Sequence, residues 1–233
     1  MRMTFPEFND APGLPADDEI HLWVVSLDST DDSCLTPDEL DRAGRFKMER
    51  IRRQFIASRC QLRQILGRYL PMPPREIPIH REPSGKPYLD PALGSPLHFN
   101  VTHSEMLGLY AVTRRGRIGV DIERWREIPN AHSLIERFFT QRERDLFQSL
   151  PESERQAAFF RIWTRKEAAL KAIGRGVQSL DQCDVTFCPG EPEQVLRMGD
   201  DHAAAGKWFL RSWHPTEDFV AAVAVELAGA GDR

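Results

Sequence analysis

Apolar and polar residues alternate along residues 117–123, as in a β-strand with one buried face. Asp121 and Glu123 occupy one set of alternate positions, and branched apolar residues fill positions 118, 120 and 122. Because successive side chains of a strand point to opposite faces, the two carboxylates share a face. Paired carboxylates suit Mg²⁺, but an acidic, solvated strand face is the commoner explanation of such a pattern.

Other periodic segments predict the remaining elements. Apolar residues at three- and four-residue intervals predict long helices at residues 53–70 and 152–171, and capping boxes at Thr36 and Thr140 mark two further helix starts. Strands are expected at residues 20–27, 77–80, 96–101, 107–113, 117–123, 183–188, 207–214 and 219–227. Both halves then have the order helix, helix, strands, which predicts a duplicated α+β unit, with a coincidence of pattern as the alternative.

A carboxylate falls on the apolar stripe of the second long helix. Glu167 lies four residues after Trp163 and three before Leu170. Because an unpaired buried charge is costly, Glu167 needs a metal ion or a cation as its partner. Lys171, at i+4, could be that partner in a purely structural salt bridge. The pattern supports this interpretation and a catalytic role of Glu167 about equally.

Three cations are candidates for anion binding. Arg59 lies on the apolar side of the first long helix, where its guanidinium either binds a phosphate or extends to solvent or to a nearby acid. Lys86 follows Gly85 in a turn that suits phosphate oxygens, although turns of this composition are common. His103 ends a predicted strand, where it either binds an anion or has a structural role.

Composition narrows the class of protein. With 233 residues, 41% of them hydrophobic, the chain can bury a sizeable core, and its net charge of −4 argues against a protein that grips nucleic acid through phosphates. The four cysteines include no CxxC pair, so the sequence supports neither a zinc ribbon nor a thioredoxin-like motif and predicts free, buried thiols. The apolar runs are too short for a signal or a membrane span, so we expect a soluble cytoplasmic protein.

Four segments together resemble the 4′-phosphopantetheinyl transferase superfamily, specifically its long, surfactin-type branch. They are Gly85-Lys86-Pro87, residues 99–104 (FNVTHS), residues 119–123 (GVDIE), and residues 163–168 (WTRKEA) followed by Lys171. The similarity extends from about residue 45 to about residue 225. It implies two related α+β halves, residues 1–117 with nucleotide contacts and residues 118–233 with the metal site and catalytic helix, and an active site in the cleft between them.

The resemblance also implies roles for individual residues. Mg²⁺, or alternatively Mn²⁺, is held by Asp121, Glu123 and Glu167, and the pyrophosphate of coenzyme A completes the coordination. The residues expected to contact coenzyme A are Arg59, Gly85, Lys86, Pro87, Thr102, His103 and Lys171, with the 3′-phosphate near Arg59, Lys86 and His103 and the pyrophosphate near Lys171. The family usually has serine at the position of Thr102, which keeps the hydroxyl and adds a methyl group beside the nucleotide.

The implied reaction moves the 4′-phosphopantetheine arm of coenzyme A to a serine of an apo acyl or peptidyl carrier protein and releases adenosine 3′,5′-bisphosphate. The carrier belongs to fatty-acid, polyketide or nonribosomal-peptide synthesis. Glu167 is the expected general base, directly or through water, and Lys171 stabilises or protonates the leaving phosphate. We expect a monomer without nucleic-acid or membrane partners. Two alternatives stay open: another metal-dependent phosphoryl-transfer enzyme, and a catalytically silent homologue that binds carrier proteins or coenzyme A.

Overall fold

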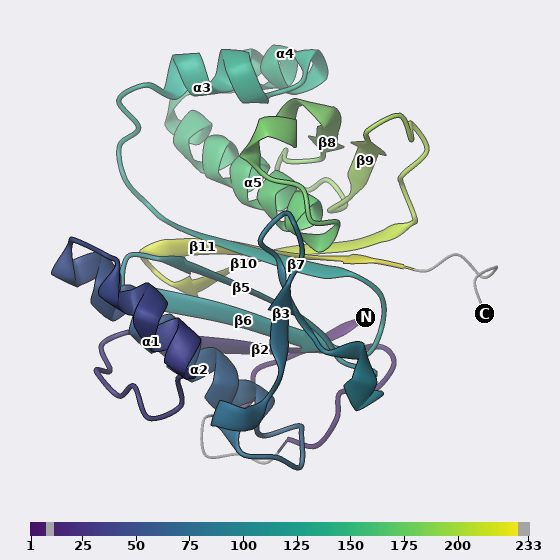
Figure 1. Cartoon of the computed structure of the whole chain (residues 1–233). Coiled ribbons are helices and arrows are strands. Elements are labelled where there is room, and N and C mark those ends of the chain that lie inside the picture. The colour runs from purple at the N-terminus through teal and green to yellow at the C-terminus, as the bar shows by residue number, and fades with distance from the viewer. Residues whose placement is uncertain (8–11, 228–233) are drawn as a thin grey trace.

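Two β-sheets lie between two long helices in the computed structural model, which describes residues 1–7 and 12–227 (Figure 1). The first sheet has the strand order β1-β2-β6-β5 and the second the order β10-β11-β7, and within them only β1 and β2 pair in parallel. The strands are β1 Arg2–Thr4, β2 Glu19–Ser26, β5 His98–Ser104, β6 Leu107–Thr113, β7 Ile118–Arg124, β10 Trp208–Thr216 and β11 Phe219–Glu226. Two small sheets pair β3 Ile79–Arg81 with β4 Pro87–Leu89, and β8 Cys183–Val185 with β9 Val195–Met198.

The helices confirm both capping boxes. They are α1 Pro37–Gly44, α2 Glu49–Leu66, α3 Ala131–Phe138, α4 Gln141–Ser149 and α5 Glu152–Ala172, with 3₁₀ turns at Pro74–Glu76, Pro91–Leu93 and Val177–Gln182. Thr36 caps α1 together with Glu39, and Thr140 caps α4 together with Glu143. Helix α5 ends within one residue of its expected end. Helix α2 ends at Leu66 rather than at residue 70, because Gly67, a poor helix former, is its C-cap.

Three apolar clusters join these layers. Ile20 and Leu22 of β2 pack with Val120 of β7 and Val223 of β11, so the inner faces of the two large sheets share one core. The outer face of the first sheet packs under α2, and the outer face of the second packs under α5. The order of layers is therefore α2, first sheet, second sheet, α5 (Figure 1). The expected α+β class is confirmed.

Short elements account for most differences from the sequence expectations. β1, β4 and β9 have three or four residues each, and β8 covers only the first half of the strand expected at residues 183–188. Such segments carry too few alternating positions to give a periodic signal. Helix α3 was also not expected. No helix in residues 1–7 and 12–227 has the length and apolar character needed to cross a membrane.

The two large sheets meet where β5 runs beside β7, and side chains make the connection there. Asn100 Oδ1 accepts a hydrogen bond from Val120 N at 3.0 Å, and Ser104 Oγ accepts one from Arg124 N at 3.2 Å. Both bonds satisfy β7 amides that lack a strand partner on this side. The polar face of β5 is thereby turned toward β7.

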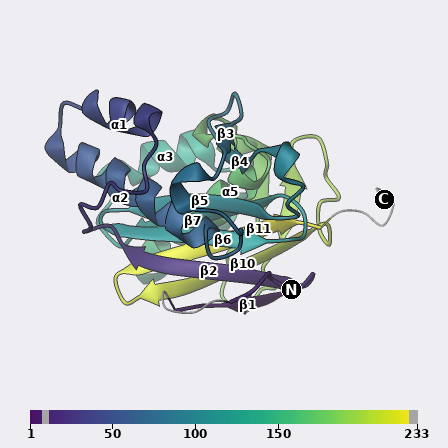
Figure 2. The ribbon, with the colours of Figure 1, turned by 60° about the horizontal axis from the view of Figure 1, so that its bottom comes forward.

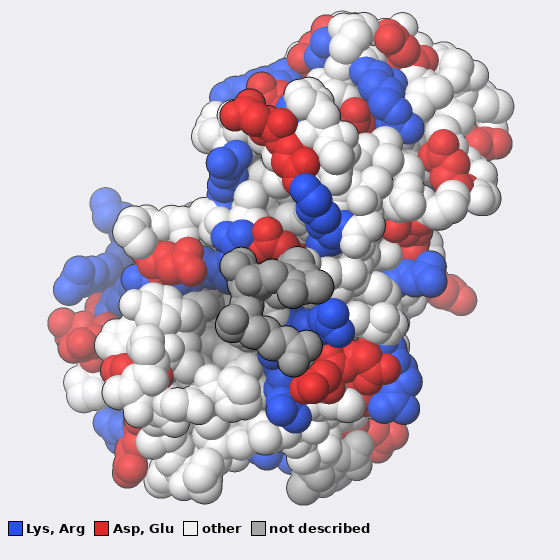
Figure 3. All heavy atoms as spheres, turned by 90° about the vertical axis from the view of Figure 1, so that its right-hand side faces the viewer, with Lys and Arg blue, Asp and Glu red and all other residues white. Residues whose placement is uncertain are grey.

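The outer surface carries the remaining elements. Helices α1 and α2 and the β3–β4 hairpin lie on one side of the first sheet, while β1 forms its free edge (Figure 2). On the face drawn in Figure 3, basic and acidic side chains are interspersed. That face therefore presents no extended field of one sign, in keeping with the small net charge.

Candidate active site

The carboxylate face of β7 lies directly beneath α5. Gly119 makes this approach feasible, because a Cβ atom at that position would lie 2.1 Å from Ala168 O and 2.4 Å from Ala172 N. A larger residue would push the helix away from the strand. Asp121 and Glu123, on the same face as Gly119, consequently lie near the side chains of Glu167 and Lys171 on α5.

Lys171 is the centre of the resulting polar group. Its Nζ donates to Asp121 Oδ1 at 2.6 Å and to Thr102 Oγ1 at 3.2 Å, and lies 3.9 Å from Glu167 Oε2. Thr102 comes from the polar face of β5, so the site unites β5, β7 and α5. The close partner of Lys171 is Asp121. A helix salt bridge with Lys171 therefore does not by itself account for the burial of Glu167.

Three carboxylates share this one lysine. Burial raises the pKa of Glu123 to about 7, and the neighbouring Asp121 adds to the increase. Burial likewise raises the pKa of Glu167 to about 7, against the opposing attraction of Lys171. For Lys171, burial lowers the pKa, but Asp121 and Glu167 outweigh it and raise the pKa above its ordinary value. Arg126 and Lys171 both lower the pKa of Glu123, but they do not offset the effect of burial, so the described cations neutralise the three carboxylates only in part.

A divalent cation would neutralise the remaining negative charge of these three carboxylates. Asp121 is 3% exposed, and its Oδ2 is buried without a hydrogen-bond partner among the described residues. Carboxylates are the ligands that Mg²⁺ prefers, and an orphaned buried oxygen needs such a partner. The three carboxylates do not each bring an oxygen within 4.8 Å of the other two. In the described chain the lysine ammonium is the cation between Asp121 and Glu167.

A cavity of about 520 Å³ opens beside this group. Its walls come from α2, the β3–β4 turn, β5, the end of α5 and residues 174–177, and its lining includes Arg59, Gly85, Lys86, Pro87, His103, Glu167 and Lys171. The volume is typical of a small-molecule site. Thr102, Asp121 and Glu123 are not among its lining residues, and Thr102 and Asp121 both contact Lys171.

The three predicted anion-binding side chains, Arg59, Lys86 and His103, differ in the contacts that they make within the protein. Arg59 lies on the cavity wall with its guanidinium 5.8 Å from the centre of the Phe55 ring. Burial, together with Lys171, lowers the pKa of His103, which favours the neutral imidazole. Lys86 Nζ donates to Ile118 O at 3.1 Å and to Ala172 O at 2.5 Å, and burial lowers its pKa to about 8. The Lys86 ammonium thus ties the β3–β4 turn to the end of α5.

Sequence reasoning missed three arginines of the cavity. Arg42 comes from α1, Arg81 from β3 and Arg175 from the loop after α5. None lies on an apolar stripe, so the criterion that singled out Arg59 does not apply to them. Asn100 was quoted as part of a motif but was not assigned a role, and it lines the cavity while joining β5 to β7.

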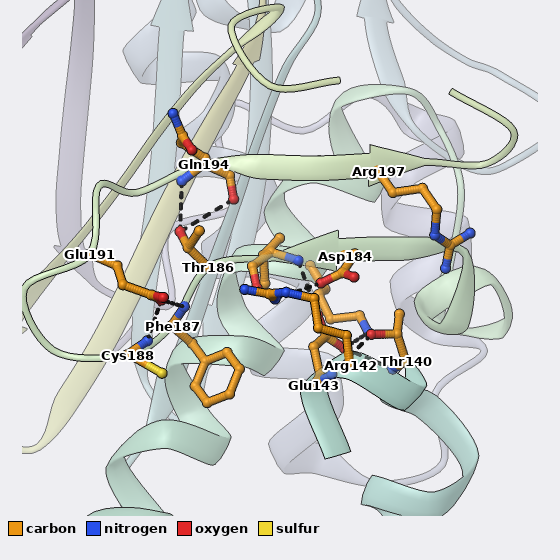
Figure 4. Close-up of polar contacts among 12 residues, drawn as sticks. Thr140, Arg142, Glu143, Asp184, Thr186, Phe187, Cys188, Glu191, Gln194 and Arg197 are labelled. Atoms are coloured by element: carbon orange, nitrogen blue, oxygen red, sulfur yellow. Dashed lines mark hydrogen bonds and ion pairs between the residues drawn. The ribbon is translucent and has the colours of Figure 1, made fainter. Parts of the chain in front are cut away.

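A second buried ion pair lies on another side of α5. Lys166 Nζ donates to Glu143 Oε2 at 2.5 Å and to Phe138 O at 2.8 Å. Glu143 also accepts from Val185 N at 3.1 Å, and Figure 4 shows it beside Thr140, the N-cap of α4 with which it forms the capping box. Both charged groups are fully buried and bonded. This pair joins α4 and β8 to α5 and leaves no open position for a ligand.

Comparison with known proteins identifies the family. A sequence model of the 4′-phosphopantetheinyl transferase superfamily matches residues 117–224, and one described as 4′-phosphopantetheinyl transferase, N-terminal, matches residues 27–114. The 4′-phosphopantetheinyl transferase HetI of Nostoc sp. is 41% identical over 221 residues, which cover 92% of this chain and 90% of that protein. The chain belongs to the 4′-phosphopantetheinyl transferase superfamily.

Other relatives match in part. A putative 4′-phosphopantetheinyl transferase of Synechocystis sp. is 36% identical over 144 residues, which cover 61% of this chain and 58% of that protein. The human L-aminoadipate-semialdehyde dehydrogenase-phosphopantetheinyl transferase is 27% identical over 164 residues, 66% of this chain and 52% of the human protein. A crystal structure of a holo-(acyl-carrier-protein) synthase from Bacillus anthracis aligns with a TM-score of 0.40 and 21% identity, and covers 49% of this chain and 98% of the synthase. The predicted family and enzyme class are confirmed by the relatives, while the surfactin-type branch and the internal duplication stay predictions.

Proposed function

We propose that this chain transfers the 4′-phosphopantetheine arm of coenzyme A to a serine of an apo acyl or peptidyl carrier protein. One observation carries the proposal: Glu167 and Lys171 form part of a cavity wall, and behind them lies Asp121, whose Oδ2 has no hydrogen-bond partner among the described residues. Such a wall suits a reaction in which negative charge is positioned and stabilised. Membership of the superfamily supports the same chemistry.

In the proposed reaction the serine oxygen attacks the β-phosphorus of coenzyme A. A new P–O bond forms, the bond to the adenosine 3′,5′-bisphosphate oxygen breaks, and the serine proton passes to Glu167, directly or through water. In the metal-free chain, burial raises the pKa of Glu167 to about 7. A bound cation would favour the ionised carboxylate, the form that accepts the serine proton. Lys171 donates a hydrogen bond to the leaving phosphate. A divalent cation, Mg²⁺ or Mn²⁺, bound by Asp121, Glu123 and Glu167 would neutralise pyrophosphate charge.

The nucleotide occupies the part of the cavity formed by residues 1–117 in this proposal, and residues 118–233 supply the metal site. Arg59 and His103 hold the 3′-phosphate, with the turn of Gly85, Lys86 and Pro87 alongside and Thr102 behind Lys171. The basic side chains of Arg42, Arg81 and Arg175 add positive charge to the same cavity. We further propose that the enzyme acts as a monomer in the cytoplasm.

A mass measurement tests the transfer. The protein is incubated with coenzyme A, Mg²⁺ and purified apo carriers from fatty-acid, polyketide and nonribosomal-peptide synthesis, and we expect at least one carrier to gain one phosphopantetheinyl unit. The same carrier with its acceptor serine replaced by alanine is the control. No gain on any carrier, with folded enzyme and metal present, would overturn the proposal.

Chelation tests the role of the metal separately. We expect EDTA to stop transfer and to leave the far-ultraviolet circular dichroism spectrum unchanged, because the metal is proposed to be catalytic and to be brought partly by the substrate. Excess Mg²⁺ should restore the activity. Unfolding upon chelation would instead indicate a structural metal.

A further inference from the structure

A separate group of metal-binding side chains lies between α2 and the connection from β2 to α1. Asp31 and Cys34 belong to the connection, and Cys60 lies in α2. Their donor atoms are all within 4.8 Å of one another, and Cys60 Sγ is 3.9 Å from Asp31 Oδ2. Within residues 1–7 and 12–227, no other group of three or more His, Cys, Asp or Glu residues has this spacing.

These distances approach those of a tetrahedral site. With Zn–S near 2.3 Å and Zn–O near 2.1 Å, the ligand atoms around a tetrahedral Zn²⁺ are about 3.5–3.8 Å apart. The three donors need to approach one another by at most about 1 Å to reach this geometry, a movement within the range of side-chain rotation. The backbone therefore already places the donors around one point.

The surroundings of the three residues bear on ligation in different ways. Asp31 Oδ1 accepts a hydrogen bond from Ser33 N at 2.9 Å, which orients the carboxylate while Oδ2 faces Cys60. Cys60 is buried at 2% exposure in a helix, whereas Cys34 is half-buried and Asp31 is exposed. A fourth position is thus accessible to water. Burial, with Cys34 beside it, raises the pKa of Cys60 to about 12. This shift opposes ligation, because a cation must displace the thiol proton in order to bind.

We propose that Asp31, Cys34 and Cys60 bind a thiophilic divalent cation of the Zn²⁺ class, with water as the fourth ligand. Two thiolates select against Mg²⁺, which prefers oxygen, so this site is chemically distinct from the carboxylate group around Asp121. The bound ion joins the β2–α1 connection to α2, the helix that contributes Arg59 to the cavity. The ion would hold the β2–α1 connection and α2 in a fixed position relative to each other.

Cobalt titration of the full chain provides the test. The protein is reduced, desalted and held in excess Mg²⁺ to occupy the carboxylate group, and Co²⁺ is then added while the thiolate-to-cobalt charge-transfer absorption is followed. We expect the absorption to saturate near one equivalent in the wild type and to be absent in Cys34→Ser and Cys60→Ser. Cys188→Ser, which removes another half-buried thiol, is the matched control and should keep it.

Two further measurements make the outcome decisive. Asp31→Asn should weaken Co²⁺ binding by at least the roughly 10–100-fold typical of losing an outer-shell partner, because Asp31 is itself a proposed ligand. Zn²⁺ should raise the melting temperature of the wild type and of Cys188→Ser, but not of Cys34→Ser. The proposal is overturned if folded wild type gives no charge-transfer absorption, or if Cys34→Ser retains it.

Discussion

Two buried groups of charge lie on the same helix, α5, and they differ in how completely they are satisfied. Lys166 meets one carboxylate, Glu143, and every partner of that pair is a hydrogen-bonded protein group. Lys171, five residues later, faces three carboxylates, and Asp121 Oδ2 has no hydrogen-bond partner among the described residues. Both groups cost desolvation, but only the second leaves a reason for a ligand to bind.

This difference in hydrogen bonding assigns a structural role to Lys166 and a functional role to Glu167, the next residue in the sequence. Lys166 and Glu167 are neighbours in the sequence, yet they point to different sides of α5 and enter different groups. A protein gains nothing in stability from an uncompensated buried carboxylate. We therefore attribute the Asp121 group to substrate and metal binding and the Glu143 pair to the assembly of α4, α5 and β8.

The largest expected effect is on transfer by Glu167→Gln. The substitution keeps the shape of the side chain and removes the charge and the base. Single-turnover transfer at saturating coenzyme A, carrier and Mg²⁺ should fall by roughly 10²–10⁴-fold, the range typical of losing a general base. Thermal melts should show a protein at least as stable as the wild type, since an uncompensated buried charge is gone.

The matched control is Glu152→Gln, which removes an exposed carboxylate from the first turn of the same helix. Its transfer rate should equal that of the wild type. A near-wild-type rate for Glu167→Gln would remove Glu167 from the active site and return it to the helix salt bridge with Lys171.

The second effect is on stability and concerns the satisfied pair. Glu143→Gln leaves the Lys166 ammonium buried without its counter-charge, and breaking such a pair costs about 3–5 kcal/mol. Urea denaturation should report this loss, while the folded fraction should retain nearly normal transfer. Lys166→Met combined with Glu143→Gln should recover much of the stability, because no charge is then left unpaired and the Gln oxygen can still accept from Val185 N. Equal losses in the double and single variants would contradict this explanation.

Local sequence patterns predicted the local features of this comparison, whereas the long-range grouping of Asp121, Glu123, Glu167 and Lys171 was expected only from the family resemblance. The burial of Glu167 followed from its place on an apolar stripe, and the capping boxes at Thr36 and Thr140 followed from residue types at fixed spacing. The contact between Lys171 and Asp121 joins residues 50 positions apart, and no local pattern encodes it. The same holds for Lys86, whose carbonyl partners come from β7 and α5.

A third, smaller effect concerns the nucleotide. Arg59→Ala should weaken coenzyme A binding by about 1.5–3 kcal/mol, the usual loss for a charge-assisted contact. The KM for coenzyme A should rise accordingly with little change in kcat, and the penalty should vanish with 3′-dephospho-coenzyme A if that analogue is a substrate. Arg53→Ala, an exposed arginine on the same helix, is the control. Equal penalties with both substrates would contradict binding of the 3′-phosphate by Arg59.

His103→Ala allows the same comparison of coenzyme A with 3′-dephospho-coenzyme A, for a side chain that carries no permanent charge. Since its pKa is lowered by burial, the imidazole should bind the 3′-phosphate as a neutral donor near pH 7. We expect a smaller rise in KM than for Arg59→Ala, and a rise that shrinks at low pH would argue against the assignment.

The smallest effect we expect is a change in how stability depends on pH, measured on metal-free protein. The pKa of Glu167 is about 7 in the folded chain and near 4.5 when unfolded, so between these values the folded state keeps a proton that the unfolded state has lost. The free energy of unfolding therefore falls as pH rises through that window, and this contribution is constant outside it. Glu167→Gln removes it, so the melting temperature of the variant minus that of the wild type should grow from pH 4.5 to pH 7. Saturating Mg²⁺ should reduce the difference, because the bound ion stabilises the ionised carboxylate in the wild type. A difference that stays constant across the window would show that Glu167 ionises as readily in the fold as in water, and the distinction between the two groups of charge on α5 would then be lost.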